Sequence, residues 1–184
     1  MDSNSLIKAL KFICGYLNEN EIPYVVVGGI SVIAWGRSRT TDDIDFIIDH
    51  KKLDIKDFVS YLKNNNFFAE TDDFIGFNSK DHCTIFYKDG LFRIDIIGVY
   101  NQDNQISVDQ STNIEFFGIK IKIDNPESLI AHKLLFGSEQ DIEDAYAILI
   151  RLNNKLNKES LYNYAERLNV SDKLKHLIKK IENE

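Results

Sequence analysis

The chain has few of the residues that mark disulfide-rich, zinc-binding or membrane-embedded proteins. Only two of its 184 residues are cysteines, Cys14 and Cys83, and they lie far apart in the sequence. This spacing excludes a disulfide framework and a cysteine zinc site, so we expect two buried, reduced thiols. The four histidines also lack the spacing of a zinc or metalloprotease site. No apolar run is long enough to cross a bilayer and the first residues do not form a secretory signal, so we expect a cytoplasmic protein with no membrane partner.

Positive charge is also in short supply. The net charge is −7 and the pI is about 5.1, which argues against a broad nucleic-acid-binding surface but leaves room for a local basic groove. The hydrophobic fraction of 43% and the length are sufficient for one domain with a well-buried core and at most a small second lobe.

Hydrophobic periodicity changes along the chain. Its first part predicts helices over 5–20, 30–35 and 52–64, and strands over 24–27, 43–48, 67–70, 74–77, 83–87, 92–99, 114–117 and 119–123. Helical spacing then predicts four helices, over 127–136, 140–151, 158–168 and 171–182. We therefore expect an α/β (α+β) fold with a mixed sheet and flanking helices over 1–124, followed by a helical region over 125–184 that packs on it.

A glycine pair and two closely spaced aspartates follow each other between two predicted strands. Gly28 and Gly29 end one apolar run, and Asp43 and Asp45 lie inside the next. Alternate residues of a strand share a face, so the two carboxylates lie side by side and repel each other unless a cation neutralises them. Glycines lack the Cβ that would keep a bulky anion away from the backbone. Metal ligands and a phosphate-binding turn in one segment indicate a nucleoside triphosphate site.

A third carboxylate lies in the apolar strand predicted over 92–99. Asp95 would be costly to bury alone, so it must be paired, metal-bound or at the solvent edge of the strand. Arg93 shares its face and is a candidate partner. Asp95 is thus the candidate third ligand for Mg²⁺ or Mn²⁺ beside Asp43 and Asp45, because these hard cations prefer oxygen ligands.

The segment GGISVIAWGRSRTTDDIDFII resembles the nucleotidyltransferase superfamily with the DNA polymerase beta-like fold. It is most similar to the prokaryotic branch that contains the abortive-infection (AbiEii-type) toxin nucleotidyltransferases. The residues that match are Gly28, Gly29, Ser31, Gly36, Arg39, Thr41, Asp43 and Asp45. A second block, PESLIAHKLLFGSEQDIEDAYAIL, is similar through Lys133, Asp141 and Asp144, although Ser138, Glu139 and Gln140 replace the basic residue that the branch often carries.

The resemblance implies a role for each matching residue. Asp43, Asp45 and Asp95 would be the catalytic carboxylates that bind Mg²⁺ or Mn²⁺. Backbone N–H groups at Gly28 and Gly29 would hold phosphates, with a hydroxyl contact from Ser31. The remaining nucleotide-binding candidates are Arg39, Thr41 and Lys133.

The implied activity is transfer of a nucleoside monophosphate from a triphosphate to a hydroxyl of a tRNA, a protein or a small molecule. A further hypothesis is that the enzyme is a toxin whose activity is inhibited by a cognate antitoxin protein. The alternative is a non-catalytic nucleotide-binding or partner-binding protein that keeps the fold.

Some of these residues also have ordinary structural interpretations. Arg37 and Arg39 could pair with nearby surface aspartates such as Asp42, where such pairs contribute little. Lys133 could simply face water. Helix capping and packing explain Asp141 and Asp144 at least as well as catalysis does.

Overall fold

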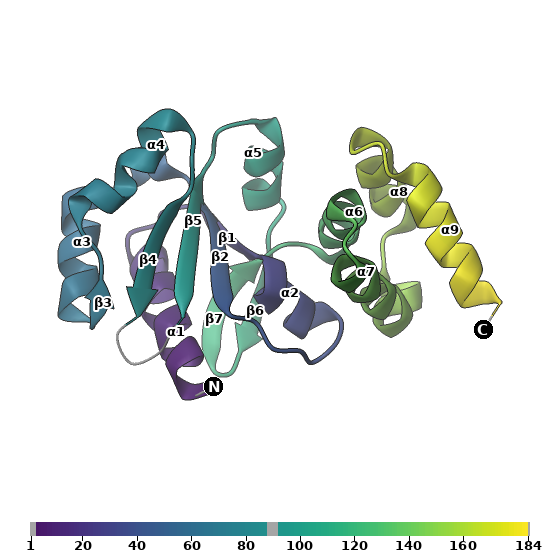
Figure 1. Ribbon diagram of the computed structural model, residues 1–184, viewed down its shortest axis with the longest axis horizontal. Helices are drawn as coiled ribbons and strands as arrows, with labels where there is room; N and C mark the ends of the chain where they lie inside the picture. The colour runs from purple at the N-terminus through teal and green to yellow at the C-terminus, as the bar shows by residue number, and fades with distance from the viewer. Residues whose placement is uncertain (1–2, 88–91, 184) are drawn as a thin grey trace. The chain divides into compact units, whose positions relative to one another are not determined.

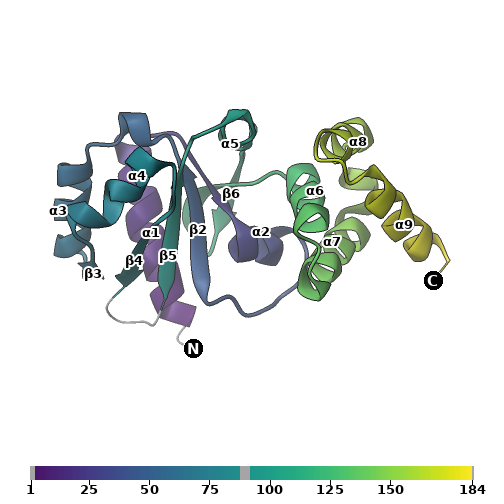
Figure 2. The same ribbon diagram turned by 45° about the horizontal axis from the view of Figure 1, so that its top comes forward.

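The computed structural model describes residues 3–87 and 92–183, and the chain divides into two compact units (Figures 1 and 2). The first unit extends to Ile30 and resumes over Thr40–Asp124. The second consists of Ser31–Arg39 and Asn125–Glu184. A short connecting helix, α2 (Gly28–Trp35), begins in the first unit and ends in the second.

The first unit is built on a seven-stranded mixed sheet with the order β3-β4-β5-β2-β1-β7-β6. The strands are β1 (Tyr24–Val27), β2 (Asp43–Ile48), β3 (Phe67–Phe68), β4 (Cys83–Tyr87), β5 (Arg93–Gly98), β6 (Thr112–Phe116) and β7 (Ile119–Ile123). At the centre, β2 pairs antiparallel with β1 and parallel with β5. The predicted mixed sheet with flanking helices is confirmed.

Helices cover one face of this sheet, where the large apolar side chains of the strands are buried. α1 (Ser3–Glu19) and α3 (Ile55–Asn64) lie on this face (Figure 1). The Phe12 ring of α1 meets the Phe67 ring of β3 at a centroid distance of 6.4 Å. Buried Ile44 and Phe46 of β2 belong to the same layer. Their alternation with Asp43 and Asp45 sends the carboxylates to the opposite face.

That opposite face is covered at one end by α5 (Gln102–Asp109). Val108 of α5 packs with Val25 of β1 and Ile47 of β2 in a small buried cluster. Ile47 is two residues beyond Asp45 on β2, so the apolar cover lies one step along the strand from the carboxylates.

Three predictions of secondary structure differ from the structure in the middle of the first unit. The strand predicted over 74–77 is instead a 3-10 helix, η2 (Thr71–Ile75), followed by α4 (Gly76–Ser79). A capping box starts η2, because the Glu70 side chain accepts from the N3 backbone and the Asp73 side chain accepts from the backbone of Glu70. The strand predicted over 67–70 shortens to β3, and α5 was not predicted at all.

The predicted bounds of the helices over 5–20 and 52–64 are close to those in the structure. The latter divides into a 3-10 turn, η1 (His50–Lys52), and α3. α3 starts at Ile55 because the Asp54 side chain accepts from the backbone N–H groups of Lys56 and Asp57. Cys14 and Cys83 are free and buried, as expected.

The second unit contains α6 (Pro126–Phe136), α7 (Glu139–Leu152), η3 (Asn153–Lys155), α8 (Lys158–Arg167) and α9 (Ser171–Glu182). Its helices start where the sequence supplies caps. The Asn125 side chain accepts from the Ser128 N–H at the start of α6, and Ser138 and Asp141 form a capping box at the start of α7. The four predicted helices are confirmed.

Among residues 3–87 and 92–183, no helix combines the length and the apolar character that crossing a membrane requires.

Candidate active site

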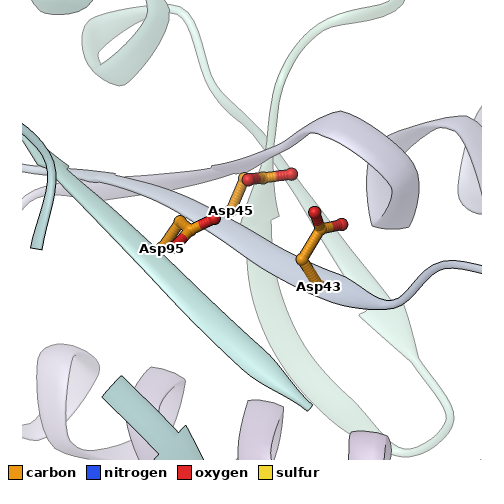
Figure 3. Close-up of side chains that lie close together, drawn as sticks. All are labelled: Asp43, Asp45 and Asp95. Atoms are coloured by element: carbon orange, nitrogen blue, oxygen red, sulfur yellow. The ribbon is translucent and has the colours of Figure 1, made fainter. Parts of the chain in front are cut away.

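Register brings Asp43, Asp45 and Asp95 to one face of the sheet. β2 and β5 run parallel, with Asp45 beside Asp95 and Asp43 beside Arg93. Paired residues of neighbouring strands point to the same side, so all four side chains project from the face opposite α1 and α3. Figure 3 shows the three carboxylates from the two strands turned toward one another.

The three carboxylates are close enough to share a cation. One oxygen from each lies within 4.8 Å of the others, and all three residues are partly buried. Oxygen ligands of a single Mg²⁺ lie about 3–4 Å apart, since each Mg–O bond is about 2.1 Å. Small side-chain movements would therefore complete a coordination sphere, and this oxygen-only donor set fits Mg²⁺ or Mn²⁺.

Arg93 is the cation that the structure places among these carboxylates. Its Nε lies 2.8 Å from Asp95 Oδ2 in an ion pair, and its Nη2 donates a hydrogen bond to Asp43 Oδ2 at 3.1 Å. The guanidinium therefore bridges β5 and β2 while remaining 52% exposed. The sequence pointed to Arg93 as a partner for Asp95, and the structure adds Asp43.

Two threonines hold the other oxygens of the same carboxylates. The Thr84 hydroxyl on β4 donates to Asp95 Oδ1 at 2.7 Å. The Thr41 hydroxyl is 3.1 Å from Asp43 Oδ1 and 3.2 Å from the Asp43 carbonyl oxygen. Thr41 thus forms a hydrogen bond with the Asp43 carboxylate in the structure, whereas the motif predicts that it binds the nucleotide. Thr84 was missed: its alternation with Cys83 and Ile85 indicates which face its side chain occupies, but only the pairing of β4 with β5 places it beside Asp95.

The glycine turn lies directly against Asp45. Gly28 has φ +63°, a conformation that L side chains rarely adopt, and a Cβ built there would collide with Asp45 Oδ2. Gly28 and Gly29 form the first turn of α2, where backbone N–H groups have no partner within the helix. Ser31, also in that first turn, is fully buried.

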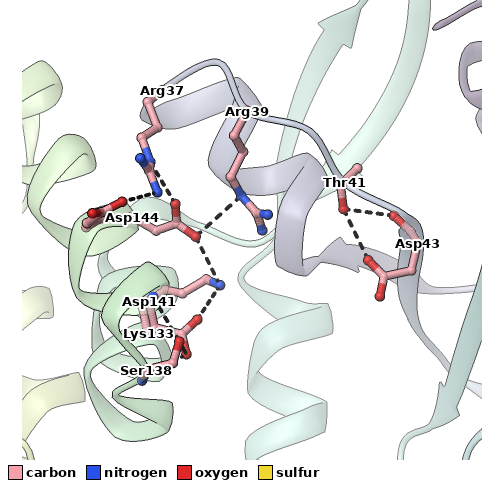
Figure 4. Close-up of polar contacts among 9 residues, drawn as sticks. Arg37, Arg39, Thr41, Asp43, Lys133, Ser138, Asp141 and Asp144 are labelled. Carbon is pink, nitrogen blue, oxygen red and sulfur yellow. Dashed lines mark hydrogen bonds and ion pairs between the residues drawn. The ribbon is translucent and has the colours of Figure 1, made fainter. Parts of the chain in front are cut away.

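The other charged motif residues meet around Asp144 in the second unit. Asp144 is fully buried and lies 3.0 Å from Arg37 Nε, 3.4 Å from Arg39 Nε and 3.3 Å from Lys133 Nζ (Figure 4). Lys133 Nζ also donates to Asp141 at 2.7 Å. Arg37 and Arg39 therefore join the loop after α2 to α7.

This network corrects two structural expectations from the sequence. Arg37 pairs with Asp144 and Glu143 rather than with the aspartates that follow it in sequence. Lys133 does not face water, because its side chain is only 10% exposed and binds two carboxylates. The structural interpretation of Asp141 and Asp144, by capping and packing, describes their contacts in the structure.

Electrostatics are consistent with these pairs. Burial raises the pKa of Asp141, but the hydrogen bond from Lys133, those from Ser138 and the lysine charge together bring it below its ordinary value. The hydrogen bond to Asp144 is the largest of the effects that raise the pKa of Arg37. Both groups stay charged at neutral pH.

Comparison with known families decides the class of protein. The model of a family described as "Nucleotidyl transferase of unknown function (DUF2204)" matches residues 6–183. The chain belongs to this nucleotidyltransferase family. No curated protein matches it significantly. The comparisons support the superfamily, and closeness to the abortive-infection branch stays a prediction of the motif.

Solved structures agree with this family in fold. An antigenic nucleotidyltransferase-like protein from Paracoccidioides brasiliensis matches with a TM-score of 0.58 and 19% identity, over 96% of this chain and 93% of that one. ANT(2")-Ia in complex with adenylyl-2"-tobramycin matches with a TM-score of 0.58 and 14% identity, over 88% and 98%. The lincomycin-bound lincosamide antibiotic adenylyltransferase LnuA matches with a TM-score of 0.52 and 17% identity, over 80% and 98%. At these identities the likeness establishes the nucleotidyltransferase fold.

Proposed function

We propose that this nucleotidyltransferase moves a nucleoside monophosphate from a Mg²⁺-bound nucleoside triphosphate to a hydroxyl group of a small molecule. The observation that carries the proposal is the convergence of three carboxylates, from β2 and β5, against the glycine turn that precedes α2. Oxygen ligands for a hard cation and a phosphate-binding turn are the two features that nucleotidyl transfer requires.

Each part of this site has a chemical role in the proposal. Asp43, Asp45 and Asp95 would hold the metal, which when bound would neutralise triphosphate oxygens and favour deprotonation of the acceptor hydroxyl. Backbone N–H groups of the first turn of α2, at Gly28 and Gly29, would bind phosphate oxygens. Phosphate contacts by Ser31, Arg39, Thr41 and Lys133 remain predictions of the motif.

Asp95 is the proposed proton acceptor, since its carboxylate lies within 4.8 Å of those of Asp43 and Asp45 and would face a hydroxyl at the same metal. The hydroxyl oxygen of the acceptor would form a bond to the α-phosphorus while the bond to pyrophosphate breaks. The hydroxyl proton would pass to an oxygen of Asp95.

A small-molecule acceptor is favoured over tRNA or protein by two observations. Of the proteins with the same fold, ANT(2")-Ia is in complex with an adenylyl-antibiotic and LnuA is bound to an antibiotic. The net charge of −7 disfavours binding of a large polyanion. The toxin role and the antitoxin partner stay predictions of the sequence resemblance.

The test is a transfer assay with a matched pair of variants. The purified protein, each α-labelled nucleoside triphosphate and Mg²⁺ are incubated with separate small-molecule, RNA and protein fractions of a lysate. We expect label in the small-molecule fraction with wild-type protein and with Asp42→Asn, whose exposed side chain lies outside the carboxylate cluster. Asp45→Asn should abolish it.

Two results would contradict the proposal in different ways. Label transfer that survives Asp45→Asn would remove the site assignment. Tight binding of Mg²⁺-triphosphate without transfer to any fraction would favour the alternative, a non-catalytic nucleotide-binding protein.

A further inference from the structure

Both oxygens of the Asp43 carboxylate and both oxygens of the Asp95 carboxylate already contact donor groups of the chain itself. One oxygen of each accepts from a threonine hydroxyl, and the other faces Arg93, through a hydrogen bond of 3.1 Å for Asp43 and an ion pair of 2.8 Å for Asp95. The Arg93 guanidinium thus contacts two of the three carboxylates that a shared metal would use. It supplies one positive charge against three negative ones.

A divalent ion that binds this cluster alone must overcome two obstacles. It meets repulsion from the guanidinium, and it must break or weaken the charge-assisted hydrogen bond from Arg93 to Asp43 and the ion pair of Arg93 with Asp95. A triphosphate removes both, because its oxygens are negatively charged and accept guanidinium hydrogen bonds in a bidentate manner. Arg93 is 52% exposed and therefore has room to turn from the carboxylates toward such an anion.

We propose that Arg93 is a resident counter-cation that holds the three-aspartate cluster closed to free divalent metal and releases it when metal arrives with a triphosphate. Arg93 is then a positioning residue that couples metal binding to nucleotide binding. This inference rests on the proposed function, because it takes the cluster to be the metal site. It predicts that free Mg²⁺ alone binds weakly and that nucleotide strengthens its binding.

Mn²⁺ binding to the full chain tests this without any need for the acceptor. The free Mn²⁺ signal is followed by electron paramagnetic resonance, with and without α,β-methylene-ATP, in wild-type protein and in Arg93→Gln. We expect Arg93→Gln to bind Mn²⁺ alone about tenfold more tightly, since one nearby positive charge is lost. The nucleotide should then strengthen Mn²⁺ binding less in the variant than in the wild type.

Lys63→Gln is the matched control for net charge. It also removes one positive charge from the first unit, but Lys63 pairs with Glu70 on the surface, outside the aspartate cluster. Its Mn²⁺ affinity should equal that of the wild type. Arg93→Lys keeps the charge but replaces the planar fork with a point donor, so its affinity for Mn²⁺ alone should lie between those of wild type and Arg93→Gln.

Circular dichroism is used first to check that each variant is folded. If Arg93→Gln does not fold, the Mn²⁺ affinity of Arg93→Lys is compared with that of the wild type instead. Equal Mn²⁺ affinity in the wild type and both Arg93 variants would overturn the inference and leave the proposed function standing. Absence of Mn²⁺ binding in every protein, with and without nucleotide, would overturn the metal site and the inference together.

Discussion

Replacing Gly28 by alanine would separate two reasons for a glycine at the turn before α2. Gly28 has φ +63°, which costs an L residue about 1–2 kcal/mol. In addition, a Cβ at this position would collide with Asp45 Oδ2, so the carboxylate would have to move. Displacement of Asp45 from its rotamer adds about 0.5–1.5 kcal/mol. Gly28→Ala should therefore lower the free energy of unfolding by about 1.5–3.5 kcal/mol.

Gly118→Ala is the matched control. Gly118, between β6 and β7, has φ +77°, and a Cβ built there has nothing within 4 Å. It should show the backbone cost alone, about 1–2 kcal/mol. Urea denaturation measures both free energies of unfolding, and calorimetry measures binding of Mn²⁺ with α,β-methylene-ATP.

Only Gly28→Ala should lose this binding, because only there does the new methyl group displace a proposed metal ligand. Wild-type binding by Gly28→Ala would refute the close approach of the turn to Asp45 as a requirement of the site. Equal losses of stability in the two variants would refute the collision itself.

Three further predictions concern other parts of the chain. Asp144→Asn removes the charge of a fully buried carboxylate that pairs with three cations, so urea denaturation should show a free energy of unfolding lower by about 3–5 kcal/mol. Glu143→Gln, at a 55% exposed side chain, should lower it by less than about 1 kcal/mol. The pKa of Asp141 is lower in the folded protein than in the unfolded one, so its stabilising contribution is present above about pH 4 and is lost as pH falls further; Asp141→Asn should flatten the pH dependence of stability there, and an unchanged profile would contradict this. Burial raises the pKa of Cys14 to about 12 and that of Cys83 to about 11, so both thiols should react slowly with Ellman's reagent at pH 8 until urea unfolds the protein, and fast reaction of the native protein would count against their burial.

Strand alternation was enough to predict which faces the carboxylates occupy. In Asp43-Ile44-Asp45 and Arg93-Ile94-Asp95, buried isoleucines alternate with charged residues, and this pattern has only one arrangement on a half-covered sheet. What alternation cannot supply is strand order. Only the parallel pairing of β2 with β5 places Asp45 beside Asp95, and the local sequence of neither strand predicts this pairing.

Local signals were misread where aromatic residues suggested strand. Phe74 and Phe77 are three residues apart and both buried, which fits one face of a helical turn, whereas in a strand they would point to opposite faces. The cap at Glu70 agrees with the helical turn. The ion-pair partners in the second unit were beyond prediction for another reason. Arg37 and Asp144 are 107 residues apart, so their contact depends on how α7 packs and not on spacing.

The most direct measurement of the central claim is a crystal structure with Mn²⁺ and α,β-methylene-ATP, in which anomalous scattering locates the metal. The proposed function predicts an anomalous peak bounded by oxygens of Asp43, Asp45 and Asp95, with the triphosphate on the turn at Gly28. Bound nucleotide with manganese elsewhere, or with no manganese at these three carboxylates, would contradict it.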